Sequence, residues 1–297
     1  MRTAAAFLCL AIAAAGGWRA MPACAEAPPL VLAGPAMGTT YRVALAAPVP
    51  GLGQGEVHRE VEAVLARLDR ALSTWRDDSD ASRFNRAASG EWVAVSGDLV
   101  AVVELARAVH EQSAGAFDIT AAASASGRAV GMRHLRSRAD PPAVMPAMMK
   151  DVAGLAIDLG GIGPGYAVDM IGTRLSSLGS AAHLVELGGE VRAWGEPAPG
   201  RPWRVLVRGP AARSLDLPAG EALGTATCRP GRSPLDPRTG LPCAGPARSL
   251  TVRAASCAAA DAWAVAAIVL GLEPGADGVV TAPSRPAVPP GARQAAP

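Results

Sequence analysis

The sequence predicts an α+β fold, in which mixed sheets and flanking helices form a single domain. Short runs of alternating apolar residues, typical of strands, occur in both halves of the chain, and stretches with the apolar spacing of helices lie between them. Strands and helices do not alternate as regular βαβ units, which disfavours a doubly wound parallel sheet. A chain of 297 residues is long enough to bury a substantial core in one unit.

The N-terminal half predicts a hairpin and two helices. Residues 30–47 alternate apolar and small residues around a Met-Gly-Thr-Thr turn, as in a β-hairpin. Helical spacing follows over 56–72, and a second helix is predicted over 96–109, with a serine as its N-cap. The polar stretch 73–80 predicts a loop, and 121–150 has too little pattern to predict regular structure.

A strand, a glycine-rich turn and a helix follow one another in the middle of the chain. The apolar run 155–159 predicts a short strand, the glycines of 160–165 a turn, and 166–178 a helix. Pro164 suits the first helical turn, where its missing N–H is not needed. The remaining pattern predicts strands at 183–187, 191–194, 203–208 and 250–253, a loop-rich segment at 209–247 and an apolar helix at 261–270.

Both ends differ in composition from the domain itself, which we place at 30–275. Residues 1–25 combine an early arginine, an apolar run and small residues before a cleavage point, which is the pattern of a secretory signal peptide. The apolar run is shorter than the roughly 20 residues that a bilayer span needs. We therefore expect an exported, periplasmic protein with no transmembrane span in the mature chain, either soluble or tethered by a lipid on Cys24. The Pro- and Ala-rich tail at 283–297 is expected to be disordered.

The charge of the chain does not favour a nucleic-acid partner, and its cysteine spacing permits a disulfide without selecting one. The chain has 28 basic and 26 acidic residues, and removal of Arg2 and Arg19 with the leader leaves 26 of each. A neutral chain without a basic cluster does not favour nucleic-acid binding, which depends on phosphate neutralisation. Cys228, Cys243 and Cys257 remain, and their spacing permits a disulfide such as Cys228–Cys243 without selecting it.

Two segments have features of a site for a phosphorylated ligand. The turn from Asp158 to Gly165 opens a helix, where free N–H groups and the helix dipole favour a phosphate, although tight turns that bind nothing share the pattern. Asp261 lies at the predicted start of an apolar helix. Its carboxylate either caps that helix or binds Mg²⁺, a hard cation that prefers oxygen ligands. The local sequence leaves both alternatives open.

The histidines do not indicate a metal centre or a hydrolytic triad. They lie in different predicted elements and lack the spacing of metal ligands, so surface positions or hydrogen-bonded partners are expected for His58, His110, His134 and His183. No nucleophile-elbow motif accompanies them.

A series of short motifs in a fixed order is more specific than any one of them. They are Met37-Gly38-Thr39-Thr40-Tyr41, Leu72-Ser73-Thr74-Trp75, Ser82-Arg83-Phe84-Asn85, Gly115-Ala116-Phe117-Asp118-Ile119-Thr120, the segment 158–169, Leu187-Gly188-Gly189-Glu190, Leu235-Asp236-Pro237-Arg238-Thr239-Gly240, and Asp261 with Gly271. Together they resemble the FAD:protein FMN transferase (ApbE-like) family over about residues 30–272.

The resemblance implies a flavin-transferase domain that moves FMN from FAD to a Thr or Ser hydroxyl of a partner protein, releasing AMP with the help of Mg²⁺. It also implies roles for single positions, with Asp158 and Asp261 taking part in catalysis. The FAD contacts that it implies are Met37, Trp75, Ala116, Phe117, Asp118, Asp158, Gly160 and Pro164. The metal ligands that it implies are the carbonyls of Gly161 and Ala258 and the carboxylate of Asp261.

The chain departs from the family pattern at three functional positions. Pro164 stands where the family usually has Lys or Glu, and Val265 stands where a Thr normally adds a metal ligand. Ser233 replaces a His, a candidate general base, three residues before the Asp-Pro-Arg-Thr-Gly motif. These changes leave an alternative to the transferase, which is a catalytically degenerate paralogue that binds flavin or a partner protein without transfer.

Overall fold

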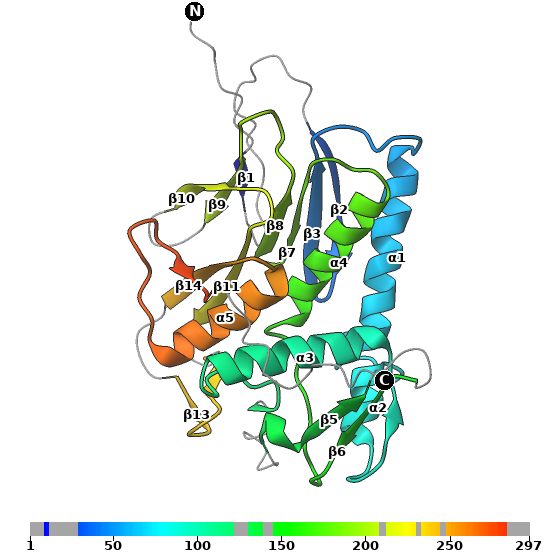
Figure 1. Ribbon diagram of the computed structural model, residues 1–297, viewed down its shortest axis with the longest axis vertical. Coiled ribbons are helices and arrows are strands. Elements are labelled where there is room, and N and C mark those ends of the chain that lie inside the picture. Colours follow the sequence, from blue (N-terminus) through cyan, green and yellow to red (C-terminus); the bar gives the residue numbers. More distant parts are fainter. Residues whose placement is uncertain are drawn as a thin grey trace, which may run out of the picture.

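A seven-stranded sheet forms the centre of the molecule, with helices packed over one face (Figure 1). The computed structural model describes residues 9–11, 29–121, 130–138, 145–207, 212–229, 233–243 and 248–283. The strands of the central sheet, in spatial order, are β15 (Val280–Thr281), β14 (Arg248–Ala254), β11 (Ala222–Cys228), β8 (Glu190–Trp194), β7 (His183–Leu187), β3 (Thr39–Leu45) and β2 (Leu30–Ala36). Neighbouring strands are antiparallel except β14 and β15.

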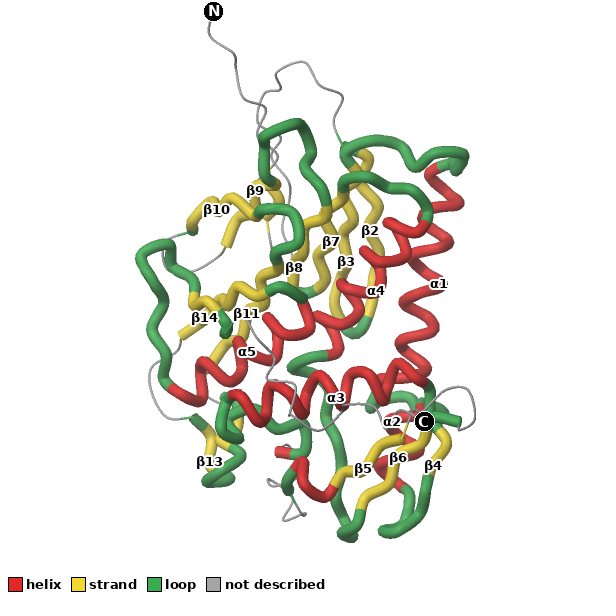
Figure 2. Tube along the Cα trace, viewed as in Figure 1, coloured by secondary structure: helices red, strands yellow, loops and turns green. Residues whose placement is uncertain are grey.

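Within the described ranges, four long helices and one short helix accompany the sheet. They are α1 (Gln54–Leu72), α2 (Asp80–Arg86), α3 (Gly97–Gln112), α4 (Gly163–Ser177) and α5 (Cys257–Leu270), with a 3₁₀ turn at Met132–His134. Helix α4 packs on β7 and β8, whereas α5 packs on β11 and β14, and the two helices contact each other. Figure 2 shows α3 crossing beneath both of them.

The four long helices begin and end within about four residues of their predicted bounds, whereas the short helix α2 was not predicted. Ser96 accepts a hydrogen bond from Leu99 N at 3.3 Å and so caps α3, as expected. Buried Val57, Val61 and Leu68 recur on one face of α1, which confirms its helical spacing. Pro164 lies in the first turn of α4, which begins three residues earlier than expected.

The described part of the chain also forms three small sheets. The first contains β1 (Cys9–Ala11), β9 (Trp203–Val207) and β10 (Arg213–Leu217), the second β4 (Val93–Ala94), β6 (Ala147–Lys150) and β5 (Leu135–Arg138), and the third β12 (Leu235–Asp236) and β13 (Leu241–Pro242). The segments 121–150 and 209–247 therefore contain more strand than the sequence predicts. In 209–247, β11 was missed because its run Ala-Leu-Gly-Thr-Ala-Thr-Cys alternates weakly.

The strand predicted at 155–159 is wrong. The backbone N–H and C=O groups there form hydrogen bonds with single residues and not with a neighbouring strand. Asn85 bonds both backbone groups of Ile157, at 2.8 and 2.9 Å, and Asp158 N donates to Ile119 O at 2.7 Å. An apolar run that is buried by loops has the same composition as a buried strand, so local sequence does not separate the two.

Two glycines allow the helices and the sheet to approach closely. A Cβ on Gly165 of α4 would lie 2.4 Å from Cys257 O of α5, and a Cβ on Gly224 of β11 would lie 2.4 Å from the Ala260 carbonyl carbon. Neither position has room for a side chain, because real Cβ atoms do not come within 3.0 Å of other atoms. Glycine at these two places therefore sets the position of α5.

The predictions for the two ends of the chain fall mostly outside the described residues. Of the predicted signal peptide only 9–11 is described, and 284–297 of the predicted tail is not. Across the described ranges, every helix is too short or too polar to cross a bilayer.

Candidate functional site

The N-terminal ends of α4 and α5 are joined by two reciprocal carboxylate contacts. Gly165 N on α4 donates to Asp261 Oδ2 on α5 at 3.1 Å. In return, Asp169 on α4 accepts hydrogen bonds from Cys257 N and Ala258 N, both at 3.0 Å. Arg192 Nη1 of β8 also donates to Asp169 Oδ1 at 2.7 Å, which ties both helices to the sheet. The glycine turn and the segment around Asp261, the two segments with features of a phosphate site, therefore lie side by side.

Asp261 does not cap its own helix, which corrects its predicted place at the helix start. Helix α5 begins at Cys257, and Ser256 is the N-cap that accepts from Ala259 N at 3.3 Å. Asp261 lies one turn further in and is buried. Burial raises the pKa of its carboxyl group to about 7. Burial and the neighbouring Asp261 also raise the pKa of Glu190, so two carboxyl groups approach each other in a dry environment.

The residues predicted to hold a metal ion fit Mg²⁺ with few protein ligands. Asp261 supplies one carboxylate beside the turn that contains Gly161, and Asp169 fixes the backbone of Ala258. Mg²⁺ commonly takes one or two carboxylates and retains waters, so it does not need a dense cluster. Indeed, the described residues contain no group of three or more His, Cys, Asp or Glu side chains able to share an ion. Burial disfavours the charged form of the Asp261 and Glu190 carboxyl groups, and a cation bound beside them would stabilise that form.

Val265 occupies the space next to Gly161. Its Cγ2 lies 3.0 Å from the position of a Cβ on Gly161, and Phe117 Cε2 lies 3.5 Å from the same position. An apolar methyl group thus faces the turn at the position where the family pattern has a hydroxyl ligand.

A hollow of about 140 Å³ beside the start of α4 collects five of the predicted FAD contacts. These are Met37, Trp75, Asp158, Gly160 and Pro164. The hollow is also lined by Asp69, Leu72, Ser73, Thr74, Leu159 and Gly163. The side chain of Trp75 is 95% exposed, so its ring is available to stack on a planar ligand.

Asp158 shapes the glycine turn from an exposed position. Its Oδ1 accepts a hydrogen bond from Gly160 N at 2.8 Å, which fixes the turn before α4. The carboxylate therefore belongs to the wall of the hollow, where a ligand can reach it.

The three other predicted FAD contacts lie outside this hollow. Ala116 is fully buried, and the ring of Phe117 faces Gly161. Asp118 Oδ1 accepts from Thr120 N at 2.8 Å and from Thr120 Oγ1 at 2.6 Å, so its carboxylate holds its own loop. Their roles toward FAD stay predictions.

The hairpin formed by β12 and β13 carries the Asp-Pro-Arg-Thr-Gly motif. Arg238 donates to both oxygens of Asp236, at 2.9 and 2.8 Å. Ser233 lies near Cys228 Sγ at 3.3 Å and donates to Arg229 O at 3.1 Å. Cys228 and Cys243 are free thiols, so the disulfide that their spacing permits is not formed.

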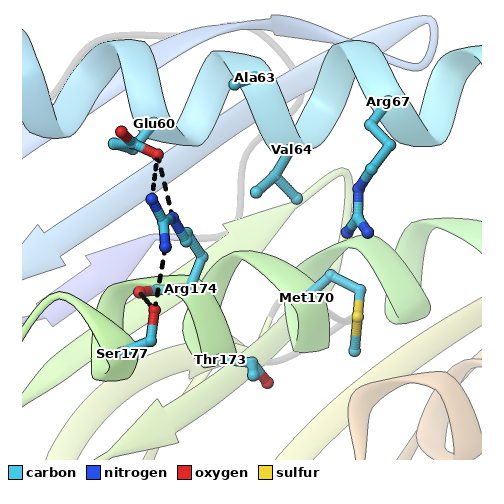
Figure 3. A pocket seen from close by; sticks show the side chains of 8 residues that line it. All are labelled: Glu60, Ala63, Val64, Arg67, Met170, Thr173, Arg174 and Ser177. Carbon is cyan, nitrogen blue, oxygen red and sulfur yellow. Dashed lines mark hydrogen bonds and ion pairs between the residues drawn. The ribbon is translucent and has the colours of Figure 1, made fainter.

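A larger hollow of about 440 Å³ lies between α1 and α4 (Figure 3). Arg174 of α4 crosses one end to Glu60 of α1, with an ion pair of 2.8 Å, and Arg67 lines the other end and pairs with Asp98 at 3.3 Å. None of the predicted site residues lines this groove, and both of its arginines already have carboxylate partners.

Sequence reasoning missed Asp169, Gly165 and Glu190 as parts of the site. The first two belong to the segment 158–169, but a contact with the start of α5 has no local signature.

Comparison with known proteins places this architecture in a family. A model of the ApbE family matches residues 37–285. The chain belongs to the ApbE family. This family member is 29% identical to the FAD:protein FMN transferase of Vibrio cholerae, over 82% of each chain. It is 30% identical to that of Klebsiella pneumoniae, over 85% of this chain and 81% of the relative.

Solved structures of the family share the fold. The apo form of the Pseudomonas stutzeri flavinyl transferase ApbE superposes with a TM-score of 0.72 at 32% identity, covering 82% of this chain and 85% of that one. The Vibrio cholerae flavin transferase ApbE gives a TM-score of 0.72 at 29% identity, covering 81% and 86%. The predicted α+β class and the family resemblance are therefore confirmed for this ApbE-family chain.

Proposed function

We propose that this ApbE-family chain transfers FMN from FAD to a Thr or Ser hydroxyl of a partner protein and releases AMP, with Mg²⁺ held beside the diphosphate. One observation carries the proposal. Asp261 meets the glycine turn at Gly165, next to a hollow lined by five predicted FAD contacts. The relatives at 29 and 30% identity are FAD:protein FMN transferases, which supports the same reaction here. We place the reaction in the periplasm, because residues 1–25 have the pattern of a signal peptide.

The chain's own residues would bind and orient FAD. Trp75 offers an exposed ring for stacking, and the free N–H groups and dipole at the N-terminus of α4 would favour a phosphate group there. Asp261 and the carbonyls of Gly161 and Ala258 would hold Mg²⁺. When bound there, the ion neutralises charge on the diphosphate and on the departing AMP.

Val265 is the observation that favours the alternative, a flavin-binding paralogue without transfer. Its methyl group faces the glycine turn, so a water has to complete the coordination that a Thr hydroxyl would supply. Both the transferase and the paralogue would bind FAD, but only the transferase would move FMN to an acceptor protein.

The test combines the chain with FAD, Mg²⁺ and the acceptor protein of the Vibrio cholerae relative. AMP is measured by chromatography, and flavin on the acceptor is measured by fluorescence in a denaturing gel. We expect both products in equal amounts, and a loss of about 100-fold or more in Asp261→Asn, which keeps an oxygen for Gly165 N but lacks the charge. FAD that is bound tightly and stays intact identifies the paralogue, and absence of flavin binding excludes both.

A further inference from the structure

Within the described part of the chain, His110 has one bonded ring nitrogen beside a carboxylate and one ring nitrogen that is free to accept a proton. It lies in the last turn of α3, and its side chain is 28% exposed. Its Nδ1 lies 2.8 Å from Phe117 O and 3.5 Å from Asp118 Oδ2. Its Nε2 has no hydrogen-bond partner among the described residues. By contrast, both ring nitrogens of His183 are bonded, and His58 Nε2 is bonded to Tyr41 at 2.8 Å.

The contact with Phe117 determines which nitrogen of His110 carries the proton. A carbonyl oxygen only accepts, so Nδ1 must donate, and the neutral ring then has its lone pair on Nε2. The carboxylate of Asp118 lies on the Nδ1 side of the ring, on the side away from the lone pair of Nε2. This is the arrangement of a general base oriented by a carboxylate.

The turn after α3 holds this pair rigidly. Gly115 N donates to His110 O at 2.8 Å, and Phe117 N donates to Ser113 Oγ at 3.1 Å. Asp118 is fixed in turn by Thr120 and by Met132 N at 3.3 Å. The side chain of Asp118 is only 3% exposed, so it keeps one orientation.

The same turn connects His110 with both parts of the proposed site. The ring of Phe117, whose carbonyl binds His110, lies against the glycine turn, with Cε2 3.5 Å from the Cβ position of Gly161. On the other side, the Cβ position of Gly115 is 3.7 Å from His110 Cε1 and 3.8 Å from Arg238 Cγ. The imidazole therefore lies close to Arg238 of the hairpin and is bonded to the backbone of Phe117, the residue whose ring packs on the glycine turn. Asp118 and Arg238 are the charged groups that the structure places beside it from other segments.

We propose that His110, oriented by Phe117 O and Asp118, is the general base that activates the acceptor hydroxyl in this chain. Ser233, three residues before the motif of the same hairpin, has no basic nitrogen and is bonded to Arg229 O. His110 brings an imidazole to this hairpin from α3 instead. The inference rests on the proposed function.

The proposed step balances without a redox change. The acceptor oxygen forms a bond to the phosphorus of the FMN half of FAD, and the bond from that phosphorus to the bridging oxygen breaks. AMP leaves with the electron pair, and the hydroxyl proton passes to His110 Nε2 and then to solvent.

The test uses His110→Asn, which retains an amide N–H near the Nδ1 position for Phe117 O but has no basic nitrogen. FAD, Mg²⁺ and the acceptor of the Vibrio cholerae relative serve as substrates. We expect kcat to fall about 100- to 10,000-fold, the usual contribution of a general base. The KM for FAD should stay within about twofold, and the acidic limb of kcat against pH should disappear.

His134→Asn is the matched control, because His134 also contacts a carboxylate through Nδ1, at 2.7 Å from Asp151, but lies in the 3₁₀ turn before β5. It should keep wild-type kcat. Added imidazole should restore part of the activity of His110→Ala, a rescue that a purely structural role would not show. Thermal unfolding of each variant verifies folding.

Two results overturn the role of His110 in different ways. If wild-type protein transfers FMN and His110→Asn keeps both the rate and the acidic limb of the pH profile, His110 is not the general base. The proposed transferase activity is then still correct. If wild-type protein binds FAD but transfers none, the proposed function fails and the role of His110 fails with it.

Discussion

The backbone N–H of Gly165 on α4 donates a hydrogen bond of 3.1 Å to the carboxylate of Asp261 on α5, 96 positions later in the chain. Four residues further along α4, Asp169 returns the contact by binding the first amides of α5. Because a carboxylate at a helix N-terminus satisfies free N–H groups, each helix stabilises the start of the other. This reciprocal pair places the proposed metal ligands next to the proposed phosphate turn.

Removal of the Asp169 carboxylate should destabilise the fold strongly. Asp169→Ala leaves two amides of α5 and the guanidinium of Arg192 without their acceptor. We expect the free energy of unfolding in urea to fall by about 3 to 5 kcal/mol, the cost of breaking a buried ion pair. Asp216→Ala removes one carboxylate partner of Arg204 at a site where the Asp216 side chain is 60% exposed, and should cost less than about 1 kcal/mol. Equal losses in both variants would contradict the role of Asp169.

Replacement of Val265 by Thr should strengthen metal binding. The Thr side chain has nearly the same shape as Val and places a hydroxyl near the turn where Val265 now presents a methyl group. We expect Mg²⁺ affinity, measured by calorimetry in the presence of FAD, to rise about tenfold, the scale on which groups around a metal change its affinity. Val265→Ala opens the same space without an oxygen and should show no gain. A Thr variant with unchanged affinity would mean that Mg²⁺ binds elsewhere.

Loss of the Trp75 ring should weaken FAD binding and leave the fold intact. Trp75 is 95% exposed beside the hollow, so it contributes little to the core. Trp75→Ala should lower FAD affinity about tenfold or more, the usual effect of removing an aromatic stacking partner. Flavin fluorescence titration measures the affinity, and Trp92→Ala, which removes a ring packed under Arg138, is the control. The prediction fails if both variants bind FAD equally well.

Acid should destabilise the protein through His183. Burial lowers the pKa of its imidazole from 6.5 to about 4, and the ring stacks on Trp194 at 5.0 Å. Between these two values the unfolded chain binds a proton that the folded chain does not, so the free energy of unfolding falls as pH falls through this window. The total loss is about 3 kcal/mol by pH 4. Unfolding in urea between pH 4 and 7 should show this slope in wild type, reduced in His183→Gln.

The difference between the pH dependence of unfolding in wild type and in His183→Gln reports His183 alone. Buried carboxyl groups change the free energy of unfolding with pH in the opposite direction. Burial raises the pKa of Glu186 to about 7, so its contribution to the free energy of unfolding falls as pH rises. Parallel curves for wild type and His183→Gln would show that His183 carries no part of the acid sensitivity.

The helices were predictable because their signals are local. The apolar face of α1, the serine cap of α3 and the proline in the first turn of α4 each depend on neighbours along the chain. Weakly patterned strands were not predictable in this way. Strand β11 pairs with β14 and β8, which come from distant parts of the sequence. The backbone of 155–159 forms hydrogen bonds with Asn85 and Ile119 and not with a neighbouring strand.

By itself, the sequence determined the α+β class, the family resemblance and the separate residues of the candidate site. The tertiary structure alone decided how those residues meet. It made Asp261 a partner of Gly165 and not a cap, brought Asp169 to the start of α5, and placed His110 against Phe117 O and close to Arg238. The physical reason is that helical spacing and capping depend on residues a few positions apart, whereas these contacts form only when packing brings distant segments together.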